Sequence, residues 1–94
     1  MTKLIAKEFP DFDVSTLPTI PFGWVDTSWH NDACPSFSNG NLVLFVDYAE
    51  PTMRECGPDA PRYSLIRYGV GSEATTVATT DEWQRMLAAI EVAR

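Results

Sequence analysis

The stretch ACPSFSNGNLVLFVD, residues 33–47, decides the fold because it holds a strong turn signal between two extended runs. Asn39-Gly40 satisfies the positive φ angles of a type I′ turn, the commonest two-residue hairpin loop. With those two residues as the loop, Phe37 faces Leu42 on the neighbouring strand. Side chains alternate between the two faces of a strand, so the large apolar residues of this hairpin share one face. That face is the predicted core face of an antiparallel sheet.

The same register gives the opposite face of the hairpin a second set of side chains. Asp32 faces Asp47 there, and Val43 and Phe45 lie on the same side. Like charges directly opposite one another destabilise a sheet, so something must compensate the two aspartates. The alternatives are an arginine, a metal, a raised pKa in one carboxyl, or a register other than this one. Arg67 is the expected arginine, ahead of Arg62 and Arg54. Val43 and Phe45 are either covered by a second layer, with the N-terminal arm as the candidate, or form an exposed apolar patch.

Working outward from the hairpin, the chain predicts an α+β fold in a single domain, residues 1–94. Residues 27–78 are expected to form a small antiparallel sheet of about four strands in a meander, with a loop at 49–61. Residues 1–26 are expected to form a largely irregular, extended arm, because prolines and a glycine interrupt them. The arm is expected to lie over the body, held by its apolar side chains Phe12, Leu17, Ile20, Phe22 and Trp24.

Residues 79–93 are predicted to form an amphipathic helix that packs on one face of this sheet. Thr79, followed three positions later by Glu82, matches a capping box at the start of a helix. The apolar residues that follow have the i, i+3, i+4, i+7 spacing of one buried stripe. That stripe consists of Trp83, Met86, Leu87 and Ile90.

The formal net charge of −6 is concentrated before Arg62. From Met1 to Pro61 nine acids, five up to Asp32 and four after it, stand against two lysines and one arginine. This balance argues against binding nucleic acid through its phosphates. No apolar run is long enough to cross a bilayer, and no secretion signal is recognisable, so no membrane is expected as a partner.

The two cysteines, Cys34 and Cys56, predict reduced thiols in a cytoplasmic protein rather than a disulfide framework. A bridge between them stays open at this level, because the sequence alone does not give their separation. No cofactor is expected.

The segment SWHNDAC, residues 28–34, is the one stretch rich in chemically active side chains. On a strand, Ser28, His30, Asp32 and Cys34 would point to the same face, which resembles the parts of a catalytic triad. Alternate residues on one strand lie about 6.5–7 Å apart and point in parallel. A nucleophile and its base need about 2.6–3.2 Å, reached by convergence from different elements. The segment therefore does not predict an enzyme.

Metal binding is the alternative interpretation of this segment. His30, Asp32 and Cys34 are competent ligands, and Asp47 is expected opposite Asp32. Structural zinc sites usually have paired, closely spaced ligands, and this chain has none. The favoured interpretation is that His30 and Asp32 form hydrogen bonds with nearby backbone at the start of the strand.

The leading hypothesis is a non-catalytic cytoplasmic binding module that docks a protein partner or forms a homodimer. One alternative is a metal- or small-ligand-binding protein, conceivably an enzyme, centred on His30, Asp32, Cys34 and Asp47. Another is an acidic inhibitor that mimics the charge of nucleic acid, a hypothesis that depends only on the net charge. The candidate binding residues are Trp29, His30, Asp32, Val43, Phe45, Asp47, Arg54 and Arg67.

Overall fold

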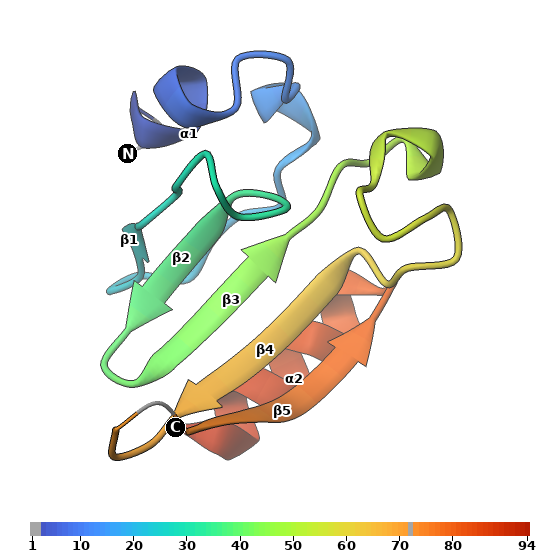
Figure 1. The fold of residues 1–94 in the computed structure, drawn as a ribbon. Coiled ribbons are helices and arrows are strands. Elements are labelled where there is room, and N and C mark those ends of the chain that lie inside the picture. The colour runs from blue at the N-terminus through green and yellow to red at the C-terminus, as the bar shows by residue number, and fades with distance from the viewer. Residues whose placement is uncertain (1–2, 72) are drawn as a thin grey trace.

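The strands follow one another across a single antiparallel sheet in sequence order. The computed structural model describes residues 3–71 and 73–94, and within them five strands have the order β1-β2-β3-β4-β5 (Figure 1). The α+β fold and the antiparallel meander are therefore confirmed. The additional strand, β1, lies in the stretch expected to be irregular. The elements are α1 (Lys3–Glu8), the 3-10 helix η1 (Val14–Thr16), β1 (Val25–Asp26), β2 (Ser36–Asn39), β3 (Leu42–Val46), the 3-10 helix η2 (Pro51–Met53), β4 (Tyr63–Tyr68), β5 (Ala74–Thr80) and α2 (Trp83–Ala93).

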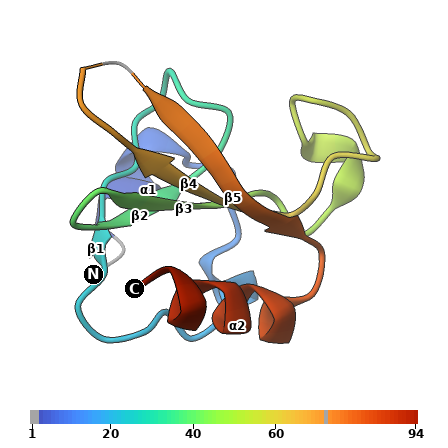
Figure 2. The same ribbon diagram turned by 90° about the horizontal axis from the view of Figure 1, so that it is seen from below.

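The two faces of the sheet differ in what covers them. One face, the helix-side face, packs against α2 through β4 and β5 (Figure 2). The N-terminal arm contributes to the same core, which confirms that it lies over the body. Its buried members are Ile5, Phe9, Phe12 and Trp24, and Leu17 and Ile20 are partly buried against them. The opposite face, the open face, lies on the other side of the sheet from α2 (Figure 2).

Phe22 departs from the expectation for the arm, because its side chain is fully exposed. Phe22 and Gly23 form a turn directly after Pro21, and Gly23 has a φ of 95°. Glycine adopts positive φ angles without the steric penalty of a side chain. The turn directs the Phe22 ring away from the core instead of holding the arm to it.

The hairpin loop is Gly40-Asn41, one residue later than predicted. Gly40 has a φ of 60°, whereas no other type of residue in the described chain has a positive φ. Glycine at the first loop position suits a type II′ turn, and Asn39 stays in the strand, paired with Leu42. The predicted pairing of Phe37 with Leu42 is therefore wrong, since Phe37 pairs with Leu44.

A register change of two residues keeps the side chains of β2 and β3 on their predicted faces, because strand side chains repeat with a period of two. The predicted core face is confirmed. Its hairpin members Phe37, Leu42, Leu44 and Val46 are all buried.

The first strand of this hairpin begins at Ser36, so residues 28–34 do not form the strand predicted for them. Pro35 has no N–H to donate to a ladder, and the backbone N–H of Asp32 donates to Trp29 O (2.9 Å) in a turn. The expected cross-strand pair of Asp32 with Asp47 is therefore not formed.

The last strand runs further than expected and displaces the start of the helix. Thr79 pairs with Ser64 in the sheet, so α2 begins at Trp83 and not at residue 79. The predicted capping box is wrong: Glu82 occupies the N-cap position without a side-chain capping bond. Instead, the N–H of Glu82 donates to Thr80 Oγ1 (3.0 Å).

The predicted helix stripe faces the core, with its members buried to different degrees. Met86 and Ile90 are fully buried, whereas Trp83 and Leu87 are only partly so. Trp83 packs against Tyr63 of β4, with ring centroids 5.1 Å apart. This contact joins the first turn of α2 to the sheet.

A bulge interrupts the pairing of β4 with β5. Leu65 pairs with Ala78, but the next residue, Ile66, pairs with Thr76, which leaves Val77 as the extra residue of β5. A bulge bends its strand and increases its local twist. Val77, at the bulge, is partly buried and packs against the core.

Candidate functional site

Half-buried apolar side chains line the centre of the open face. Val43 pairs with Ile66 of β4, and Phe45 follows Val43 by two positions on the same side of β3. These three residues, the apolar strip, are each partly exposed. Of the two alternatives for Val43 and Phe45, the covering arm is wrong, because the arm packs on the helix-side face. Serine hydroxyl groups flank the strip at Ser36, Ser38 and Ser64.

One end of the apolar strip opens into a cavity of about 290 Å³, the Cys34 cavity. Phe45 and Ile66 belong to both the strip and the cavity wall. Asp47, Ser64 and residues of loop 27–35 and loop 49–61 form the remaining walls. The residues from outside the strip are Asp32, Ala33, Cys34, Asp47, Cys56, Ala60, Pro61 and Ser64.

The Cys34 cavity is lined by acidic side chains and by free thiols. Asp32 and Asp47 bring two carboxyl groups, and none of the lining residues is basic. Burial raises the pKa of the Asp47 carboxyl, an effect that the hydrogen bond from Tyr48 N (2.8 Å) partly opposes. Burial, followed by the nearby Asp47 charge, raises the pKa of the buried Cys34 thiol and keeps it protonated. A protonated thiol is a poor nucleophile.

The second thiol of the Cys34 cavity differs from the first in access to solvent. Cys56 is exposed, and both cysteines are free, so no bridge links them. Any reagent from solution therefore meets Cys56 before Cys34.

His30 lies apart from the Cys34 cavity. Its Nδ1 is 2.7 Å from Glu8 Oε1, and its backbone N–H donates to the same oxygen (3.1 Å). These hydrogen bonds lower the pKa of the Glu8 carboxyl. The histidine thus bonds a distant side chain, not nearby backbone as favoured from the sequence. Trp29 is half exposed and its ring lies 4.2 Å from the His30 ring.

The four residues of the metal hypothesis are only partly brought together. Asp32, Cys34 and Asp47 line one cavity, whereas His30 is not among its lining residues. Within residues 3–71 and 73–94, no group of three or more His, Cys, Asp or Glu side chains is placed to hold a metal ion.

Arg54 holds the shape of loop 49–61. Its side chain is only 7% exposed and lies 3.6 Å from Asp81. Its guanidinium donates to the backbone oxygens of Tyr48 (2.8 Å) and Ala60 (2.8 Å). Three carbonyl groups are bound in total, including that of Ala49 at 3.4 Å, so the residue fixes the wall of the cavity from inside the loop.

The expectation that Arg67 compensates Asp32 and Asp47 is wrong. Its Nη2 donates to Ala93 O (2.7 Å) at the end of α2. A cationic side chain suits this position, because the last carbonyl groups of a helix lack partners and carry partial negative charge. Arg67 therefore joins the helix to β4 on the helix-side face.

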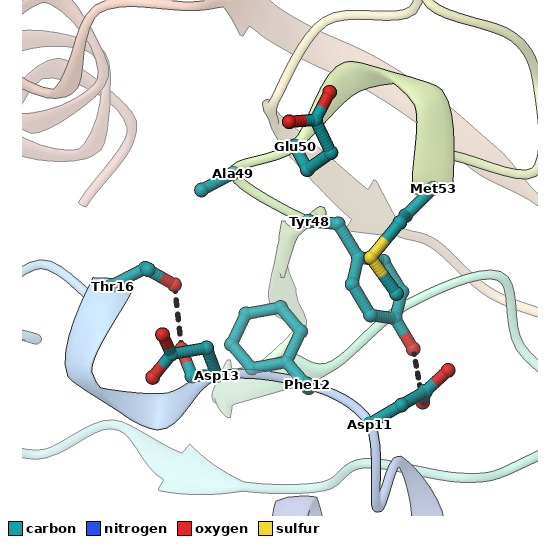
Figure 3. A pocket seen from close by; sticks show the side chains of 8 residues that line it. All are labelled: Asp11, Phe12, Asp13, Thr16, Tyr48, Ala49, Glu50 and Met53. Carbon is teal, nitrogen blue, oxygen red and sulfur yellow. Dashed lines mark hydrogen bonds between the residues drawn. The ribbon is translucent and has the colours of Figure 1, made fainter.

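A second cavity, of about 340 Å³, lies between the N-terminal arm and loop 49–61 (Figure 3). In this Tyr48 cavity the phenol of Tyr48 donates to Asp11 Oδ1 (3.0 Å) and packs 5.1 Å from the Phe12 ring. Burial and the bond to Asp11 raise the pKa of Tyr48 to about 12. The other lining residues are Asp13, Thr16, Ala49, Glu50 and Met53.

The carboxyl groups around the Tyr48 cavity stabilise local structure. Asp13 accepts from Ser15 N (3.0 Å) at the start of η1, and Glu50 accepts from Thr52 N (3.4 Å) at the start of η2. Both are acidic residues two positions before a hydroxyl residue, a capping pattern that sequence reasoning missed and could have found. The sequence also missed Ile66, although its position next to the core residue Leu65 places it on the open face.

No protein-family profile matches the chain, and neither does any curated protein or solved structure. None of the helices in the described residues has the length and apolar character required to span a membrane.

Proposed function

We propose that this chain is a small non-catalytic, cytoplasmic binding module that docks a protein partner on its open face. The observation that carries the proposal is the continuity of the apolar strip with the Cys34 cavity through Phe45 and Ile66. An apolar centre with polar surroundings is the usual composition of a protein interface. The hydroxyl groups of Ser38 and Ser64, which are both partly exposed, would supply the polar surroundings here.

The charge of the cavity specifies the chemistry of the partner. Asp32 is exposed at the cavity, and no basic residue lines the cavity. Asp47, in contrast, is buried and already close to the charges of Arg54 and Arg62. A lysine or arginine of the partner would complement Asp32, while aliphatic side chains next to it would cover Val43 and Phe45. The expected partner segment therefore places a basic residue beside apolar ones.

A binding role fits the state of the reactive groups better than a catalytic role. Burial raises the pKa of the Cys34 thiol, so that it is not an activated nucleophile. The one histidine of the chain is bonded to Glu8, outside the cavity lining. The cavity, at about 290 Å³, is slightly smaller than typical small-ligand sites, which begin at about 300 Å³.

Selection from a displayed library of random peptides tests this proposal directly. We expect the wild-type protein to enrich peptides with lysine or arginine beside aliphatic residues. Asp32→Asn and Val43→Thr should weaken binding of the selected peptides roughly tenfold each, the loss of about 1.4 kcal/mol. Asp59→Asn and Val92→Thr, at exposed positions outside the cavity lining and the strip, are the matched controls.

Enrichment of peptides without basic residues, or equal weakening by the control variants, would contradict the proposal. Salt distinguishes it from the acidic inhibitor predicted from net charge. Binding that depends on the apolar strip persists at about 1 M salt, where the Debye length is only about 3 Å, whereas binding through charge alone is lost.

A further inference from the structure

A third cavity, of about 300 Å³, lies between α1 and β1 at one edge of the sheet. This α1–β1 cavity is lined by Lys3, Leu4, Trp24, Val25 and Asp26. Leu4 and Val25 are 40% and 63% exposed, although both are apolar. Within residues 3–71 and 73–94, the cavity thus presents exposed apolar side chains at the β1 edge of the sheet, away from β4 and β5 (Figure 1).

The fully exposed ring of Phe22 lies close to this cavity in the chain. Its backbone is three residues from Val25, and three residues span at most roughly 10–11 Å. Phe22, Leu4 and Val25 together form the β1 patch. Exposed apolar side chains within reach of one another mark interaction surfaces more often than scattered ones.

Charge indicates what covers the β1 patch. The Tyr48 cavity is lined by three carboxyl groups and the Cys34 cavity by two, and no basic residue lines either. The α1–β1 cavity has one of each sign, Lys3 and Asp26. Asp26 is also buried, because its carboxyl accepts from the N–H groups of Ile5 (3.1 Å) and Ser28 (3.0 Å). A chain of net charge −6 therefore meets a second copy of itself with the least repulsion at this cavity.

We propose that the β1 patch is a two-fold interface between two copies of this chain. The Phe22 ring of each copy fills the α1–β1 cavity of the other. A two-fold axis makes such contacts reciprocal: if the Phe22 ring of one copy enters the cavity of the second, the Phe22 ring of the second enters the cavity of the first. A single axis can form both contacts because Phe22 and the α1–β1 cavity are close to each other in the chain. The open face stays accessible in this dimer, so the inference does not depend on the proposed function.

Sedimentation equilibrium of the full chain, from micromolar to millimolar concentration, tests the interface. We expect a reversible dimer whose dissociation constant Phe22→Ser raises roughly a hundredfold, tenfold for each of the two rings. Val92→Ser is the matched control, since Val92 is also an exposed apolar residue but lies on α2. Phe22 makes no buried contact, so thermal unfolding of Phe22→Ser should match that of the wild type.

Charge reversal at the cavity is the second arm of the test. Lys3→Glu should weaken the dimer at low salt and much less at high salt, whereas Lys7→Glu should have a smaller effect, since Lys7 does not line the cavity. Val43→Thr and Asp32→Asn should leave the dimer unchanged, which separates this inference from the proposed function. A wild-type chain that stays monomeric at millimolar concentration would overturn the inference. A dimer that Val43→Thr weakens and Phe22→Ser does not would also overturn it.

Discussion

The two faces of the sheet use the same strands for different purposes. Leu44 and Phe45 are neighbours on β3, yet Leu44 is completely buried beneath the arm and α2 whereas Phe45 is partly exposed beside a cavity. The helix-side face contains nearly all of the large buried side chains. The open face has apolar residues in a strip flanked by serines. The alternation of side chains along each strand therefore separates the residues that stabilise the fold from the residues of the proposed binding face.

The largest expected effect tests this separation within one pair of neighbours. Leu44→Ala should lower the free energy of unfolding by about 2–5 kcal/mol, because it leaves a cavity in the core. Phe45→Ala should cost clearly less, although the deleted side chain is larger, because solvent already reaches it. Urea denaturation of both variants measures the difference. Equal losses would show that the open face is as important for stability as the helix-side face.

The second effect concerns the polar contact that fixes α1 to β1. Asp26→Ala leaves the buried N–H groups of Ile5 and Ser28 without their acceptor. The substitution should lower the free energy of unfolding by roughly 1–3 kcal/mol. Asp59→Ala, at an exposed position, is the control. A variant as stable as the control would show that water replaces the carboxyl group.

A smaller effect is expected where the arm meets loop 49–61. Tyr48→Phe removes the hydrogen bond to Asp11 and should lower the free energy of unfolding by about 0.5–1.5 kcal/mol. Ultraviolet titration provides a second readout, because burial and Asp11 raise the pKa of Tyr48 to about 12. The tyrosinate signal that appears near that pH should be absent from the variant. If the signal persists in the variant, it belongs to another tyrosine.

The smallest effect is the pH dependence contributed by Asp47 on the open face. Burial raises the pKa of this carboxyl above its ordinary value of 3.8, so the folded state keeps its proton where the unfolded chain has lost it. Its contribution to stability therefore falls as pH rises from that value through the raised pKa. Asp47→Asn should gain stability relative to the wild type over this window, as measured by thermal unfolding at several pH values. A gain that appears instead as pH falls would contradict the raised pKa.

The sequence predicts the two faces well because they depend on alternation alone. Phe37 and Leu44 remain on the core face despite the change of register, since the loop moved the pairing by two residues. The predicted position of the turn is wrong by one residue. Asn39-Gly40 and Gly40-Asn41 both put glycine in a two-residue loop, and only the strand pairing next to the loop distinguishes them. The predicted start of the helix at residue 79 is also wrong, because Thr79 pairs with Ser64 in the sheet and does not cap the helix.

The candidate site was less predictable than the fold. Asp32, Cys34, Phe45 and Asp47 do line one cavity, but only Phe45 reaches it from a strand. The contact between His30 and Glu8 joins residues 22 positions apart, and no local pattern announces it. The exposure of Phe22 follows from the backbone angle of Gly23, which the sequence permits without requiring.

The bulge in β5 has a consequence for the solubility of the protein. The strand ATTVATT is uncharged, rich in β-branched residues and located at the edge of the sheet, a composition that favours edge-to-edge aggregation and amyloid growth. Val77 bends this edge, and Glu73 and Asp81 place like charges at its two ends. Incoming copies of the same strand in antiparallel register would bring these carboxylates together. The bulge and the two terminal carboxylates therefore disfavour fibril formation at this edge. Deletion of Val77 would remove the bulge and leave only the carboxylates.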